Sequence, residues 1–387
     1  MSKIPQLKSS SPVIDAFLPV IATLAALVMG AGMLLALGAN PIVAYRALLD
    51  GAFGSVNSLT DTLVRATPLL FVGVGICIAF RGGVINIGGE GQFVAGALLG
   101  TIVALSFPEG PALLVVPLGF LAGAAGGAVW GGIPGFLKAR FNVNEILSTV
   151  MMNQIAVQGM NFLLLGPLID PVQLERASRI PQTARISQAF SLPRLVPTRL
   201  HLGTLLAVVM AVGVYVLLWR TTLGYRIRAV GLNPEAARYA GINVPRHIVL
   251  SMALSGAMAG LAGAVQIFGV NFRMFTDGSA TGFTGSAGFH GIVAALFGQL
   301  HPLGTIPAAI LFGGLLVGAN KLQRAVQVPA ALIVTLNGLV VIFVVGTELW
   351  RQKRARRRDA EAVLLSEEPL PDDEAHDDEA FTETAPV

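Results

Sequence analysis

Few side chains of this sequence could do chemistry, and many of them lie in two glycine-rich stretches between apolar runs. The first stretch, Arg81 to Phe93, reads RGGVINIGGEGQF. Five glycines within eleven residues disfavour a regular helix, and an interrupted helix at membrane depth is tolerated only against protein or a wet cavity. Backbone carbonyls and the side chains of Asn86, Glu90 and Gln92 would then be available to a polar solute. The alternative is a tight cytoplasmic turn between two spans.

The second stretch, Gly282 to Gly304, reads GFTGSAGFHGIVAALFGQLHPLG. A glycine-rich entry, a short apolar run and a turn that contains proline predict another broken span. Two interrupted spans in the two halves of a transporter indicate the substrate region. Within these stretches Phe93 and Phe289 either face the substrate or pack in the core, and His290 is either a ligand or a satisfied core histidine.

Three amide side chains, Gln154, Gln158 and Asn161, recur at helical spacing and share one helix face. In lipid such groups must point at other helices or at water. They predict either interhelical hydrogen bonds or a polar stripe along a pore.

Several catalytic signatures are missing from the sequence. The chain contains no G-x-x-x-x-G-K-[ST] phosphate loop, no H-E-x-x-H motif and no G-x-S-x-G motif. Its single cysteine, Cys77, excludes an intramolecular disulfide, and its five histidines show no metal-ligand spacing. The chain therefore cannot hydrolyse ATP through a phosphate loop, and we expect no cofactor or metal in it; if energy comes from ATP, a separate subunit supplies it.

One polar stretch between two apolar runs, Thr221 to His247, has strong local signals for a short helix. Asn233 suits the N-cap, Pro234 suits the first helical position, and Glu235 places negative charge in the first turn. A well-capped helix in a loop between membrane spans is either a docking element for an aqueous partner or a surface helix that closes a turn.

The segment from Glu235 to Gly241 matches the EAA-x-x-x-G pattern of permease subunits in bacterial ABC importers, although the usual I-x-L-P ending is absent at 251–254. The two glycine-rich stretches also resemble the branched-chain amino acid, ribose and nucleoside permease family. Glu90 departs from the sugar-type pattern and favours the nucleoside branch.

This resemblance implies a permease that imports nucleosides, with ribose-like sugars or branched-chain amino acids as alternatives. It implies a coupling helix that binds the ATPase, a second and homologous permease subunit, a cytoplasmic ABC ATPase that binds ATP and Mg²⁺, and an extracytoplasmic substrate-binding lipoprotein. A stand-alone secondary transporter is the further alternative, with Glu90 as its candidate for ion coupling. We expect ATPase coupling at Asn233, Pro234, Glu235, Ala236, Ala237, Arg238 and Gly241, and a substrate pathway at Asn86, Glu90, Gln92, Phe93, Gln154, Gln158, Phe289 and His290.

Composition sets the fold class. The chain is 54% hydrophobic and 12% charged, with a mean hydropathy of +0.71, which is typical of an all-α polytopic membrane protein. We expect ten membrane crossings with broken or re-entrant segments. They are predicted at 14–37, 60–80, 92–107, 111–137, 145–166, 201–219, 248–269, 288–300, 303–320 and 328–348.

The distribution of basic residues predicts the orientation. With both termini cytoplasmic, sixteen of the 26 Lys and Arg residues lie inside. Residues 1–13 form the cytoplasmic N-terminus and 14–348 the permease domain of a bacterial inner-membrane protein, with a coupling loop at 220–247. The loop 167–200 is then extracytoplasmic although it carries five arginines. Residues 349–387 form a basic, then acidic tail that we expect to be disordered. The basic segment would contact anionic lipid, and no patch suits nucleic acid.

Overall fold

The computed structural model describes residues 12–175 and 180–329, together with isolated residues between 335 and 346. Throughout this part of the chain the regular elements are helical, and extended pairing is limited to two isolated bridges, Gln182–Phe275 and Arg194–His201. An all-α membrane fold is therefore confirmed. The predicted crossing at 328–348 and the tail at 349–387 lie almost wholly outside the described residues.

The helices follow the predicted spans closely. The elements are α1 (Pro12–Ala36), α2 (Pro41–Phe53), α3 (Val56–Arg81), α4 (Gly89–Ser106), α5 (Ala112–Phe141), α6 (Glu145–Leu165), α7 (Pro171–Leu174), η1 (Gln188–Phe190), α8 (Leu202–Arg220), α9 (Thr222–Leu232), α10 (Pro234–Tyr239), α11 (Val244–Gln266), η2 (Ile267–Asn271), α12 (Ala280–Thr284), α13 (Ala287–Phe297) and α14 (Thr305–Val326).

Six helical segments among the described residues are long and apolar enough to cross a membrane: α3, α4, α5, α8, α11 with η2, and α14. α13 and residues 24–36 of α1 are shorter apolar segments. The amide-bearing helix α6 has 21 residues but is not among the six. The chain is thus a polytopic membrane protein, whereas the count of ten crossings remains a prediction.

Glycines let three of the spans approach closely. A Cβ atom on Gly127 of α5 would lie 2.1 Å from the Gly256 carbonyl oxygen of α11, and one on Gly260 would lie 2.1 Å from the Gly123 carbonyl oxygen. On α4, a Cβ on Gly96 would lie 2.3 Å from Gly260 Cα. Small residues allow such backbone contact in lipid, where van der Waals packing drives helix association. This packing fixes α4 against α5 and α11.

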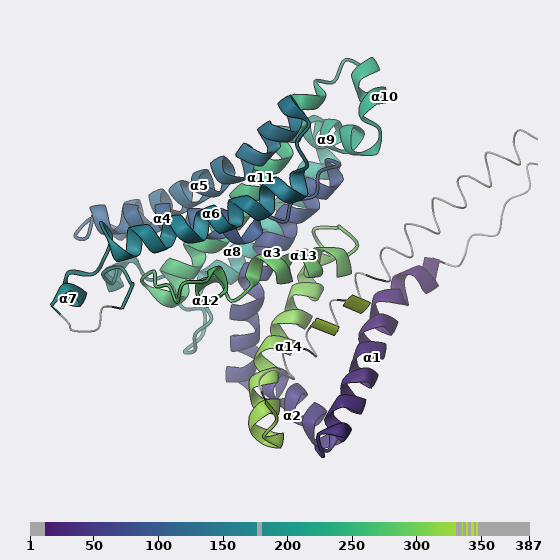
Figure 1. Ribbon diagram of the computed structural model, residues 1–387, viewed down its shortest axis with the longest axis vertical. Helices are drawn as coiled ribbons and strands as arrows, with labels where there is room; N and C mark the ends of the chain where they lie inside the picture. Colours follow the sequence, from purple (N-terminus) through teal and green to yellow (C-terminus); the bar gives the residue numbers. More distant parts are fainter. Residues whose placement is uncertain are drawn as a thin grey trace, which may run out of the picture.

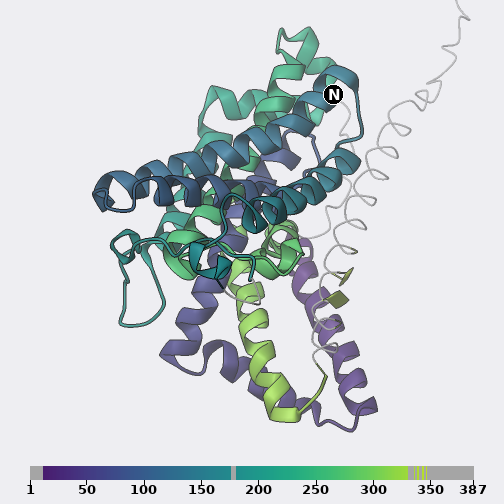
Figure 2. The ribbon, with the colours of Figure 1, turned by 60° about the vertical axis from the view of Figure 1, so that its left-hand side comes forward.

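The molecule has two distinct ends along its long axis. Figures 1 and 2 show α9 and α10 projecting at the top, and α2 with the last turns of α14 at the bottom. The turn between α3 and α4 belongs to the upper end, because Gly83 on this turn packs against Gly231 of α9. The loop before α8 and the start of α3 belong to the lower half.

Candidate functional site

The turn between α3 and α4 contains the first polar group of the predicted substrate pathway. Asn86 and Gln92 are buried and bind each other through two amide hydrogen bonds of 3.0 Å. Asn86 also accepts a hydrogen bond from the Gly88 N–H (2.9 Å) and donates one to Ser255 Oγ on α11 (2.8 Å). α3 ends at Arg81 and α4 begins at Gly89, so residues 82–88 between them are not helical.

α6 holds the turn from its other side. Asn153 accepts a hydrogen bond from the Gly91 N–H (2.8 Å) and donates one to the Ile87 carbonyl (3.0 Å). The neighbouring Gln154 and Gln158 are exposed on the outer face of α6. Sequence reasoning missed Asn153, because the repeat of amides selects a helix face without indicating which residues point inward.

Glu90 connects α4 to the predicted broken span. Its Oε1 accepts hydrogen bonds from the backbone N–H groups of Gly288 (2.9 Å) and Phe289 (3.3 Å), in the first turn of α13. Thr284 of α12 also forms a hydrogen bond with this carboxylate. Ser286, the N-cap residue of α13, makes no side-chain capping bond. Glu90 therefore takes the role of the cap, because its Oε1 accepts two backbone N–H groups of the first turn of α13.

A helix interruption is present in the second stretch. α12 and α13 are separated by Gly285 (φ 62°) and Ser286 (φ 61°), two consecutive residues in the left-handed region. This conformation interrupts the helix, and the interruption lies beside the Glu90 carboxylate. The prediction of an interruption in the stretch 282–304 is thus confirmed.

The aromatic and histidine candidates fall into two groups. Phe93 is fully buried and packs edge to face on Phe283, with ring centroids 6.0 Å apart. Phe289 is 47% exposed and His290 is half-buried. Packing accounts for Phe93, whereas Phe289 presents its ring at the surface of this chain.

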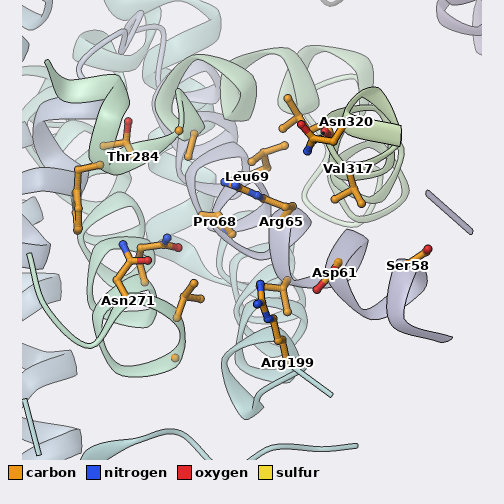
Figure 3. Close-up of a pocket in the computed structure, with 18 of the residues that line it drawn as sticks. Ser58, Asp61, Arg65, Pro68, Leu69, Arg199, Asn271, Thr284, Val317 and Asn320 are labelled. Carbon is orange, nitrogen blue, oxygen red and sulfur yellow. Dashed lines mark hydrogen bonds between the residues drawn. The ribbon is translucent and has the colours of Figure 1, made fainter. Parts of the chain in front are cut away.

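A cavity of about 1260 Å³ opens in the lower half of the molecule (Figure 3). Its walls come from the first half of α3, the second half of α14, residues 266–275 and the break between α12 and α13. None of the eight residues predicted for the substrate pathway lines it, although Phe283 and Thr284, which contact Phe93 and Glu90, do. The charged lining residues are Asp61, Arg65, Arg185, Arg194, Arg199, Lys321 and Arg324.

The local sequence contained a weak signal for part of this lining. Asp61 and Arg65 are the charged residues at the start of the otherwise apolar span 60–80, and the loop 167–200 was notable for its arginines. The convergence of α3, this loop and α14 on one cavity requires long-range contacts that no local pattern reveals.

The upper end of the molecule carries the predicted coupling helix. Asn233 Oδ1 accepts hydrogen bonds from the N–H groups of Glu235 and Ala236, both 3.0 Å, and Pro234 is the first helical residue. Ala237 is buried in a small cluster with Val230 and Val244. The other residues of the predicted surface, Glu235, Ala236, Arg238 and Gly241, are exposed.

Two large side chains of this end are almost fully exposed. Leu232 is 87% exposed and Tyr239 is 94% exposed. Both flank or belong to α10, so the end of α9 and α10 present an apolar surface on this chain. This surface was not identified from the sequence, where the capping residues dominated the signal.

Trp219, at the end of α8, joins the upper end to the membrane helices. The guanidinium groups of Arg81 and Arg228 lie 5.5 and 5.6 Å from its ring centroid. Its ring also packs on Tyr215 (5.5 Å) and His301 (4.9 Å). The cluster connects α9, which leads into α10, with the end of α3 and with the loop between α13 and α14.

Residues 58–345 match the model of a family described as branched-chain amino acid transport system / permease component. The chain belongs to this permease family. It is therefore a transport component and not an enzyme, and the resemblance predicted from the two glycine-rich stretches and α10 is confirmed. No solved structure matches the chain.

Among curated proteins, the guanosine ABC transporter permease protein NupP of Bacillus subtilis is 36% identical over 329 residues, covering 85% of this chain and 92% of NupP. The glucose ABC transporter permease protein TsgB13 of Haloferax volcanii is 36% identical over 347 residues, covering 87% of this chain and 88% of TsgB13. The nucleoside ABC transporter permease protein NupB of Lactococcus lactis is 34% identical over 332 residues, covering 84% of this chain and 89% of NupB.

Proposed function

We propose that this chain is the membrane-spanning permease subunit of an ATP-driven ABC importer that carries nucleosides across the bacterial inner membrane. The observation that carries the proposal is the similarity to NupP and NupB, which extends over more than four fifths of this chain. Their names assign them to guanosine and nucleoside transport. Glu90, which favoured the nucleoside branch from the sequence, lies beside the broken span.

A sugar importer is the second candidate. It is favoured by TsgB13, a glucose permease with the same 36% identity as NupP. Import of branched-chain amino acids is suggested by the description of the family alone. A stand-alone secondary transporter offers no reason for the exposed, well-capped α10 and is the weakest alternative.

In this proposal α10 docks in the cytoplasmic ATPase, which binds ATP and Mg²⁺. The exposed Leu232 and Tyr239 and the rigid N-cap of Asn233 support a docking role. Closure of the ATPase pair would move α10 as a lever, and the Trp219 cluster gives this movement a physical route to α3 and α14. The transporter would then alternate between its outward and inward openings.

The orientation follows from the same assignment. If α10 faces the cytoplasm, the lower end with α2, the loop 180–200 and the cavity faces outward (Figure 1). Both termini are then cytoplasmic and the polypeptide crosses the membrane ten times. This topology agrees with the excess of basic residues in the predicted cytoplasmic segments.

A second permease subunit completes the membrane core in this proposal. Bacillus subtilis and Lactococcus lactis each have two relatives of this chain, NupP with NupQ and NupB with NupC. NupQ is 29% identical to this chain and NupC is 27% identical to it. This pairing supports a heterodimer of homologous permeases, served by an extracytoplasmic binding lipoprotein.

The test is uptake of labelled nucleoside, ribose and glucose by cells with and without the gene, with a plasmid copy as the control for specificity. We expect the deletion to abolish nucleoside uptake, the plasmid to restore it, and sugar uptake to stay unchanged. Loss of sugar uptake alone would establish the second candidate instead.

A further inference from the structure

The cavity in the outer half of the proposed transporter is lined by an excess of positive charge (Figure 3). Extracytoplasmic segments are normally the side of a membrane protein that is poor in Arg and Lys. Two of the cations have partners: Lys321 pairs with Asp50, and Arg185 lies over the Phe272 ring at 5.7 Å. Within the described part of the chain, four more have no carboxylate within 4.0 Å, and these are Arg65, Arg194, Arg199 and Arg324.

Arg65 differs from the other three by its place beside the broken span. Its Nη1 lies 3.2 Å from the position that a Cβ on Gly285 would occupy. Gly285 is the first of the two left-handed residues between α12 and α13. In the view of Figure 3 the Arg65 side chain extends from α3 into the space between Thr284 and Asn320. A solute that reaches the broken span from outside therefore meets this guanidinium.

A guanidinium group presents paired N–H donors in a rigid plane and has no acceptor. Its best partner is a ligand with two adjacent acceptor atoms. Among nucleobases, guanine and hypoxanthine offer O6 and N7 side by side, whereas adenine replaces the O6 acceptor with an amino donor. Phe272 and Phe275, both half-buried, give the same cavity an apolar and aromatic wall, which suits the face of a planar base.

We propose that Arg65 is a specificity-determining residue that binds the O6 and N7 edge of 6-oxopurine nucleosides such as guanosine and inosine. The proposal rests on the nucleoside-import function proposed above. Arg194, Arg199 and Arg324 add positive potential to the cavity. They attract solutes with acceptor groups without distinguishing one base from another.

The experiment compares guanosine and adenosine uptake by the complete importer, reconstituted in proteoliposomes with its ATPase and its own binding protein. Because every preparation has the same binding protein, a change in the guanosine-to-adenosine ratio of kcat/KM reports on the permease. We expect Arg65→Gln to lower this ratio about tenfold, the loss expected for one bidentate contact. Arg65→Lys keeps the positive charge but not the paired N–H donors of the guanidinium, and it should lower the ratio similarly.

Arg324→Gln is the matched control, since it removes a cation from the same cavity on α14. It should change uptake of both nucleosides by the same factor. The ratio does not depend on the amount of folded protein, so a modest loss of stability in any variant does not alter the result.

An equal loss of guanosine and adenosine uptake in Arg65→Gln, or an unchanged ratio, would overturn the role of Arg65 and leave the proposed function intact. Stronger inhibition of guanosine uptake by guanosine monophosphate than by unlabelled guanosine, lost in Arg65→Gln, would assign Arg65 to a phosphate and also overturn it. Failure of the unmodified importer to take up any nucleoside would overturn the proposed function together with this inference.

Discussion

The turn between α3 and α4 and the cavity beside α12 are both polar regions of an apolar chain. They differ in whether their polar side chains have partners within the chain. In the turn, the amide groups of Asn86, Gln92 and Asn153 are paired with partners inside the chain. In the cavity, Arg65 and Arg199 have no carboxylate partner among the described residues. Buried groups with partners stabilise the fold, whereas exposed donors without partners are available to a ligand.

Glu90 joins these two regions through its hydrogen bonds to the start of α13. It belongs to the first turn of α4, which the amide network holds, and it caps α13, which borders the cavity. A movement of the turn would therefore move the N-terminus of α13. The following predictions test this division between structural and ligand-binding groups, ordered by their expected effect on the stability of the fold.

The largest effect is expected for Asn86→Leu, a change of similar size that removes the amide. It leaves the Gly88 N–H and the side chains of Gln92 and Ser255 without a partner in a buried site, at a cost of about 1–3 kcal/mol for each. We expect little folded protein in the membrane and a strongly lowered melting temperature in detergent. Gln154→Leu, on the exposed face of α6, is the control and should be stable. A wild-type melting temperature for Asn86→Leu would contradict the structural role of the network.

A change in pH should produce the next largest effect, through His201. This residue precedes α8, is 1% exposed, and has no hydrogen-bond partner for either ring nitrogen among the described residues. Burial lowers the pKa of His201 to about 4 from the ordinary value of 6.5. Between these pH values the unfolded chain therefore binds more protons than the folded chain. The contribution of His201 to the free energy of unfolding is fully present above about pH 6.5 and falls by about 3 kcal/mol toward pH 4.

The measurement for His201 is the melting temperature of the purified protein in detergent from pH 7.5 down to pH 4.5. His201→Phe keeps an aromatic ring but cannot be protonated, so the part of the decline due to His201 should disappear. An identical pH dependence in the two proteins would show that other groups cause the decline.

A smaller effect on stability is expected for Glu90→Ala, because it removes the cap of α13. Loss of a cap costs about 0.5–2 kcal/mol. Transport should fall while the ATPase subunit still co-purifies with the permease. Glu90→Gln keeps an acceptor oxygen and should recover most of the stability. A Glu90→Ala protein that is fully stable but inactive would instead make Glu90 a direct ligand of the substrate.

The smallest effect on the fold is expected for Gly241→Asp, next to α10. Gly241 has a φ of +77° and nothing lies within 4 Å of the position of a Cβ atom. Because Asp tolerates the left-handed region, the fold should remain, but the added charge should weaken binding of the ATPase and uncouple transport. Gly278→Asp is a matched control, with a φ of +92° and equally open space, and it should remain coupled. Normal transport by Gly241→Asp would contradict the coupling role of α10.

These regions also differ in how far the sequence predicts them. α10 begins at Pro234 and the break lies within 282–304, as predicted, because helix caps and glycines act over a few residues. The partner of Glu90 could not be predicted, since Gly288 lies 198 positions away. Likewise, Asn153 and Asn161 make side-chain hydrogen bonds from α6 to other segments, whereas the predicted Gln154 and Gln158 are exposed, because helix periodicity alone does not identify the face that contacts protein.

In the proposed function, ATP bound by an ATPase that docks on α10 drives nucleoside movement through this chain. The most direct measurement is accumulation of labelled guanosine in proteoliposomes that contain the complete importer, with ATP or without it. We expect accumulation that requires ATP and this permease and that is lost in Gly241→Asp. Guanosine accumulation that proceeds equally without ATP, or no nucleoside accumulation at all, would contradict it.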